Sequence, residues 1–167
     1  MKLSKFIAAP LILFIIFICT SSCSKPHYTE YHLIVNIHEY EVKNSPDLFD
    51  EKPEVFFQVD TESEIDTSDI YNEYKVNFVE QGKTYNFSLK GKAHDDEVVF
   101  SVNMYDDDAL EDVVDAIFGD GDDHSDFIEG TTITVRIPDG DLSGTVTIDG
   151  EDGYLKFSYI IENLVEK

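Results

Sequence analysis

The chain has 167 residues, of which 35 are acidic and 12 are basic, so its formal net charge at pH 7 is −23. This charge repels a phosphate backbone, which excludes nucleic acid as a partner, and it disfavours adhesion to anionic lipid by charge alone. Divalent cations, cationic ligands or plain solubility remain as explanations for the acid.

Residues 1–22 have the organisation of a signal peptide. Two lysines precede an apolar run over residues 6–19, and small polar residues then lead into Cys23. The run is shorter than the roughly 20 residues that span a bilayer, and Pro10 interrupts it. A cleaved leader is therefore favoured over a permanent transmembrane helix. Its removal takes away two lysines and no acid, which changes the net charge to −25.

The segment Thr20-Ser21-Ser22-Cys23 resembles the lipobox of bacterial lipoproteins, in which a lipidated cysteine becomes the new amino terminus. The resemblance implies acylation of Cys23, which would hold the chain on a membrane through a tether over residues 23–30. Thr20 stands where the family prefers an aliphatic residue, so ordinary signal-peptidase cleavage near Ser22 remains an alternative.

Cysteine usage agrees with lipidation. Cys19 lies inside the leader, so Cys23 is the sole thiol of the exported chain and no disulfide can form within it. We expect a lipid-anchored protein of a bacterial cell envelope. Ser24, rather than aspartate, follows Cys23, and by the same resemblance this favours the outer membrane.

From residue 31 onward, apolar residues recur with period two between turn signals, which predicts one all-β domain over residues 31–162. A phase shift after His38-Glu39 predicts a β-bulge, and Gln81-Gly82 predicts a hairpin turn between the third and fourth strands. Eight strands are expected, centred on Leu33, Val35, Ile37, Tyr40 and Val42; Val55, Phe57 and Val59; Tyr74, Val76 and Phe78; Tyr85, Phe87 and Leu89; Val98, Phe100, Val102 and Met104; Ile133, Val135 and Ile137; Val146 and Ile148; and Leu155, Phe157, Tyr159 and Ile161.

One segment departs from this period. Residues 110–117 carry apolar side chains at i, i+3, i+4 and i+7, the spacing of one helical face. Asp108 would cap its start, Glu111 occupies the capping-box position, and Gly119 follows its end. We therefore expect a short helix between the fifth and sixth strands.

Eight antiparallel strands should form a β-sandwich, because a single sheet would leave one apolar face in water. If strand directions alternate, the connections at 43–53, 80–82, 106–130 and 150–153 emerge at one end. Self-repulsion there is costly unless a cation binds. The acid of that end comprises Asp47, Asp50, Glu51, Glu80, Asp106, Asp107, Asp108, Glu111, Asp112, Asp115, Asp120, Asp122, Asp123 and Asp126.

Residues 31–162 resemble the C2 domain, an eight-stranded β-sandwich that often binds calcium through aspartates on loops at one end. The resemblance is carried by residues 33–37, by residues 50–57 and above all by residues 100–112, where a strand runs into an Asp-x-Asp pattern. It implies a C2-like fold with a calcium site. The ligands implied are Asp106, Asp108 and Asp112, with Asp115 as a rival for the third position, and Asp47 and Asp50 from another loop.

The physical chemistry agrees with this ligand type, since calcium takes six to eight oxygen ligands from carboxylates and carbonyls. Alternation in an extended segment also places Asp106 and Asp108 on the same side. Purely structural interpretations remain open. Asp108 would cap the helix, Asp112 and Asp115 would form its solvated face, and Asp47 would follow Pro46 in a turn.

No signature of an enzyme is found: the sequence has no nucleophile elbow, phosphate-binding glycine loop or HExxH motif, and its five histidines are scattered. We therefore expect a non-enzymatic protein. The first hypothesis is a membrane-anchored C2-like module that binds calcium. The second is an envelope interaction protein that binds protein or glycan with no metal site, and the third is an unrecognised hydrolase.

Overall fold

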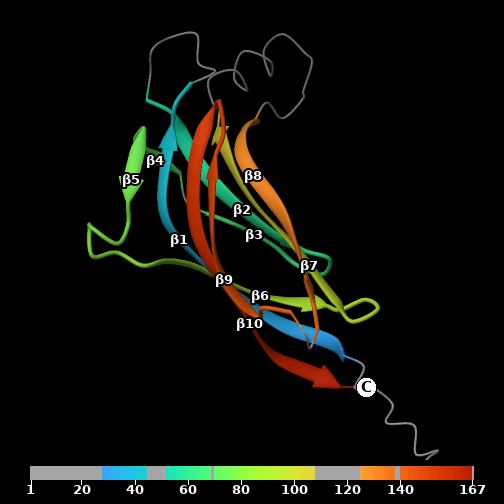
Figure 1. Cartoon of the computed structure of the whole chain (residues 1–167). Helices are drawn as coiled ribbons and strands as arrows, with labels where there is room; N and C mark the ends of the chain where they lie inside the picture. Colours follow the sequence, from blue (N-terminus) through green and yellow to red (C-terminus); the bar gives the residue numbers. More distant parts are fainter. Residues whose placement is uncertain (1–27, 45–51, 69, 108–124, 138–139, 167) are drawn as a thin grey trace, which may run out of the picture.

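A computed structural model of the chain describes residues 28–44, 52–68, 70–107, 125–137 and 140–166 (Figure 1). No helix occurs within these ranges, and the helix predicted over residues 110–117 lies outside them. The strands are β1 (Tyr28–Val42), β2 (Glu54–Thr61), β3 (Ile65–Thr67), β4 (Tyr71–Asn72), β5 (Lys75–Asn77), β6 (Tyr85–Lys92), β7 (Glu97–Asp107), β8 (Ser125–Arg136), β9 (Ser143–Asp149) and β10 (Gly153–Glu166).

The strands form two antiparallel sheets packed face to face, so the predicted all-β fold is confirmed (Figure 1). The first sheet has β1 between β10 and the pair β5 and β6, with β9 at the far edge. The second has β2 between β7 and the pair β3 and β4, with β8 at the far edge. We call these sheet 1 and sheet 2.

The predicted number of eight strands is wrong, because β3 and β4 were not recognised. They have three and two residues, too few to display an alternating pattern. Both pair with β2, one after the other, as β5 and β6 do with β1. The ten strands therefore fill eight positions, with one edge of each sheet made of two short pieces.

The hairpin predicted at Gln81-Gly82 is also wrong. β5 pairs with residues 39–41 of β1 and β6 with residues 30–37, so both follow the same edge of β1 rather than pairing with each other. Residues 78–84 form a loop between β5 and β6, and Phe78 holds both ends of it. The Phe78 N–H donates to the His38 carbonyl at 2.8 Å, and the Phe78 carbonyl accepts a hydrogen bond from the Lys83 N–H at 2.8 Å.

The predicted bulge in β1 is confirmed. The pairing of β1 with β10 shifts register between Ile37 and Glu39, so Ile37 and Tyr40 both point into the core. The inward positions predicted for β1, β2, β7 and β10 are buried, whereas Tyr85, Ile133, Val146 and Ile148 are only partly buried. Tyr74 is 41% exposed although Val76 and Phe78 are buried. Tyr74 precedes β5 and therefore does not share its alternation.

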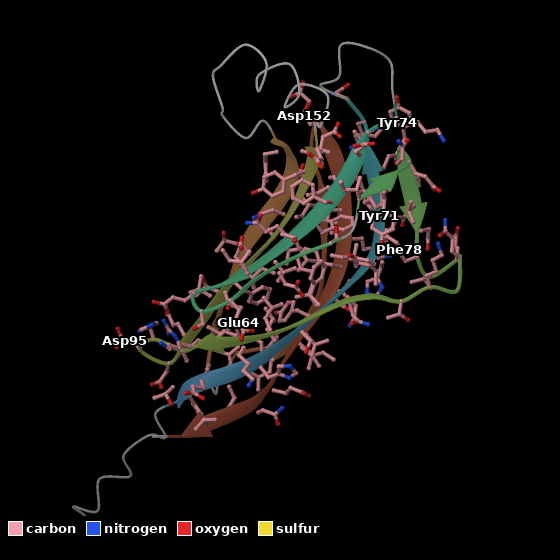
Figure 2. All side chains as sticks on the ribbon, turned by 180° about the vertical axis from the view of Figure 1, so that it is seen from behind. Glu64, Tyr71, Tyr74, Phe78, Asp95 and Asp152 are labelled. Carbon is pink, nitrogen blue, oxygen red and sulfur yellow. The ribbon has the colours of Figure 1, made fainter. Side chains whose placement is uncertain are left out.

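Aromatic side chains fill the core beside the two divided edges. Ring centroids lie 5.3–6.5 Å apart in a cluster that joins both sheets. Figure 2 shows Tyr71 and Phe78 together there, with Tyr74 nearer the end of the sandwich. Such rings bury large apolar areas, which stabilises β4 and β5 despite their few backbone hydrogen bonds. The cluster comprises Tyr40, Phe57, Tyr71, Phe78, Tyr85 and Phe87.

The sandwich has two distinct ends (Figure 1). At the loop end, β1, β7 and β9 finish while β2, β8 and β10 begin. This is the end predicted for the connections 43–53, 106–130 and 150–153, although β7 extends to Asp107 and β8 begins at Ser125. At the terminal end, Tyr28 pairs with Glu166. The 80–82 connection instead lies along the edge of β1, so Glu80 does not belong to the loop end.

Candidate functional site

Asp106 is the one predicted calcium ligand among the described residues. The inward positions of β7 end in Met104 and Asp106, and Asp106 is only 1% exposed. Its Oδ1 accepts a hydrogen bond from the Glu54 N–H at 2.8 Å. The buried carboxylate thereby joins the end of β7 to the start of β2.

The other predicted site residues, Cys23, Asp47, Asp50, Asp108 and Asp112, lie outside the described residues, as does the alternative ligand Asp115. Within the described part of the chain, no group of three or more His, Cys, Asp or Glu side chains is arranged to hold a metal ion. In the same residues, no helix has the length and apolar character needed to cross a membrane.

The described surface of the loop end is acidic. Lys43 lies at the end of β1, where its ammonium pairs with Asp149 and donates to the Gly150 carbonyl at 2.9 Å. Its neighbour Asn44 donates to the Glu151 carbonyl at 3.0 Å, and Figure 2 places Asp152 at the same end. These contacts join the end of β1 to the β9–β10 turn.

A cleft of about 490 Å³ lies at the terminal end, formed by β1, β6, β10 and the β2–β3 connection. Tyr31 crosses the sandwich beneath it, and its hydroxyl donates to the Val99 carbonyl at 3.1 Å. Burial, together with the charge of Glu62, raises the pKa of Tyr31 to about 12, so this phenol stays protonated. The cleft is lined by Glu30, Tyr31, His32, Ser63, Lys90, Gly91, Lys92, Asn163 and Val165.

Gly91 permits this arrangement. A Cβ at that position would lie 2.1 Å from Cζ of the Tyr31 ring, closer than any side chain can approach. The floor of the cleft therefore depends on a glycine in β6 opposite an aromatic residue in β1, which are paired in the sheet.

His32 lies at the wall of the cleft and joins three strands of sheet 1. Its Nε2 is 2.8 Å from Ser88 Oγ on β6, and its Nδ1 is 3.2 Å from Glu162 Oε1 on β10. Asn163 has a φ of +52° and places its Nδ2 3.3 Å from the same carboxylate oxygen. Serine, imidazole and carboxylate are thus connected in one hydrogen-bonded chain.

Sequence reasoning missed this constellation. His32 is 56 residues from Ser88 and 130 from Glu162, and no motif connects them. The prediction of a β5–β6 hairpin also placed β6 beside β5, although β6 pairs with β1. If β1 is known to lie between β6 and β10, Ser88, His32 and Glu162 can be placed on three neighbouring strands of the sheet.

No protein-family model matches the sequence, and no curated protein matches it significantly. Several solved structures with a similar architecture are C2 domains. An isolated C2 domain has a TM-score of 0.53 at 10% identity, over 80% of this chain and 99% of that one. A C2 domain of a plant extended synaptotagmin 1 has a TM-score of 0.50 at 12% identity, over 85% and 99%.

A further match is the human GIVD cytosolic phospholipase A2, with a TM-score of 0.53 and 12% identity over 81% of this chain. The chain spans only 17% of that enzyme's length. At these identities the likeness concerns the fold alone. The chain therefore has a C2-like β-sandwich.

Proposed function

We propose that the chain is a membrane-tethered, C2-like binding module whose acidic loop end holds calcium. The observation that carries the proposal is the position of Asp106, a buried carboxylate at the loop end of a C2-like sandwich, where the resemblance places the first calcium ligand. Carboxylate oxygens are hard donors of the kind that calcium prefers, so this residue fits the ion. Asp47, Asp50, Asp108 and Asp112 would complete the coordination.

The tether would hold the opposite end of the module. Cys23 precedes the first residue of β1 by five positions, which extend over at most about 18 Å. β1 has 15 residues and, at about 3.3 Å per residue, carries the chain roughly 50 Å to the loop end. The calcium-binding loops would therefore face away from the anchoring membrane, toward a partner in the surrounding space.

Cys23→Ser is expected to release the protein from the membrane, because it removes the only acylation site. The measurement is fractionation of cells that express the full-length chain, followed by detergent phase partitioning. The wild type should enter the detergent phase and the variant the aqueous phase. Retention of the variant on membranes after a salt wash would contradict the lipid anchor.

Isothermal titration of the full-length protein with calcium chloride tests the binding step. We expect saturable heat with calcium and much weaker heat with magnesium, because magnesium requires strict octahedral geometry and dehydrates reluctantly. Asp106→Asn should weaken calcium binding at least tenfold, since it removes a charged ligand while the amide oxygen can still accept the Glu54 hydrogen bond.

A second candidate is an interaction module that binds protein or glycan without a metal. The contacts of Lys43 favour it, since this lysine already compensates part of the acid at the loop end. Equal heats for calcium and magnesium would support this alternative and contradict the calcium site.

A further inference from the structure

Beyond that binding function, we propose that Ser88, His32 and Glu162 form a hydrolytic site for carboxylic esters at the terminal end of sheet 1. Ser88 is the nucleophile, His32 is its general base, and Glu162 is a positioning residue that orients the imidazole. The site is independent of the calcium-binding loops, because those lie at the other end of the sandwich.

The hydrogen bonds have the order that nucleophilic catalysis requires. The Ser88 hydroxyl is 2.8 Å from His32 Nε2, and the carboxylate of Glu162 is 3.2 Å from the other ring nitrogen. A carboxylate on Nδ1 fixes the tautomer in which Nε2 is free to accept the serine proton, and it stabilises the imidazolium that forms. Both distances agree with those of a functional relay.

The backbone beside Glu162 departs from regular strand geometry. The pairing of β1 with β10 shifts register between Glu30 and His32, which places a bulge next to Glu162. Asn163 adopts a left-handed φ of +52° there, a conformation that asparagine tolerates better than most residues other than glycine. Bulges of this kind redirect a side chain, and here Asn163 also contacts the Glu162 carboxylate.

The adjacent cleft indicates the class of substrate. Its volume of about 490 Å³ suits a small molecule. Lys90, Lys92 and Glu30 line it. Three further carboxylates lie beside it, since Glu62 raises the pKa of Tyr31, Glu64 accepts the Lys90 N–H at 2.7 Å and Glu162 contacts His32, so the cleft is not locally positive. Ser88 is exposed on the same face of β6 as Lys90. A small, uncharged ester therefore fits best.

Ester hydrolysis at this site would proceed in two steps, acylation of Ser88 and hydrolysis of the acyl-serine. Ser88 Oγ attacks the carbonyl carbon while its proton passes to His32 Nε2, and collapse of the tetrahedral intermediate expels the alcohol, which takes that proton. Water then gives its proton to His32 and attacks the acyl-serine, which releases the carboxylic acid and returns the proton to Ser88.

The same sheet provides a matched control. His38 Nε2 lies 2.9 Å from Ser158 Oγ, so β1 and β10 also hold a serine–histidine pair. Within the described part of the chain, no carboxylate forms a hydrogen bond with the His38 ring. Burial and the nearby Lys156 lower the pKa of His38, which makes its imidazole a weaker base.

The test is covalent labelling of the full-length protein with a fluorophosphonate probe, which modifies activated serines, followed by mass spectrometry of the modified peptides. We expect modification of Ser88 and none of Ser158. His32→Asn should slow labelling at least about 100-fold, the usual contribution of a general base. Glu162→Gln should slow it tenfold or more, and Glu162→Asp, which keeps the carboxylate, should restore part of the rate.

Turnover is measured with 4-nitrophenyl acetate and with the hemisuccinate ester, which carries a carboxylate. The uncharged acetate should be hydrolysed with the lower KM, because the carboxylates beside the cleft repel the hemisuccinate. Labelling at Ser158 equal to that at Ser88, labelling that survives His32→Asn, or absence of hydrolysis of both esters would each overturn the proposal. Circular dichroism of the His32 and Glu162 variants is the control for folding, and their spectra should match that of the wild type.

Discussion

Phe78→Ala is expected to lower the free energy of unfolding by about 3–5 kcal/mol, the usual cost of removing a buried phenylalanine ring. Phe78 is 1% exposed, and its ring centroid lies 5.3 Å from Tyr85, 5.5 Å from Tyr71 and 6.1 Å from Tyr40. At about 2–4 °C per kcal/mol, the melting temperature should fall by roughly 6–20 °C. Thermal and urea unfolding followed by circular dichroism measure the loss.

The next residue is the matched control. Val79 is 64% exposed, so Val79→Ala should change the free energy of unfolding by no more than about 0.5 kcal/mol. A loss in Val79→Ala as large as that in Phe78→Ala would mean that the backbone turn, rather than the buried ring, holds β5 and β6 on β1.

Calcium at a hundred times its dissociation constant is expected to stabilise the protein by about 2.7 kcal/mol, because the ion would bind the folded state and not the unfolded chain. For a domain of this size the melting temperature should rise by roughly 5–11 °C. Magnesium should produce a smaller rise, since it keeps its water ligands. Differential scanning fluorimetry in calcium, magnesium and chelator measures the three values.

Screening of the net charge of −23 could imitate part of this rise, so ionic strength must be held constant. Asp106→Asn combined with Asp108→Asn is the control variant, because asparagine keeps the shape and removes the charge. It should lose the calcium response and melt no lower than the wild type in chelator. A response that survives both substitutions would contradict the proposed ligands.

The long strands could be predicted from the sequence because each has one face in the core. β2, β7 and β10 have inward residues at every second position, and burial follows that alternation. The bulge after Ile37 could be predicted for the same reason. A single extra residue reverses the phase of the apolar pattern, and Tyr40 shows the reversal in the sequence.

Pairing partners could not be predicted in the same way. The alternation of Val76 and Phe87 shows which face is buried but not which strand lies alongside, and both β5 and β6 pair with β1. The site at His32 depends on that pairing, since its partners come from two different neighbouring strands. The inward position of Asp106 follows from the alternation of β7, but its hydrogen bond to the Glu54 backbone required the β2–β7 register.

The antiparallel pairing of β1 with β10 has a mechanical consequence. It extends from Tyr28 opposite Glu166 to Val42 opposite Gly153, along the whole length of β1. If the proposed tether pulls on the start of β1 while a partner holds the loop end, the force runs parallel to the strands. The hydrogen bonds on both sides of β1 are then loaded in shear and must break together. Force applied instead between Tyr28 and the C-terminal strand would open the same pairs one at a time, so resistance to pulling depends on the direction of the load.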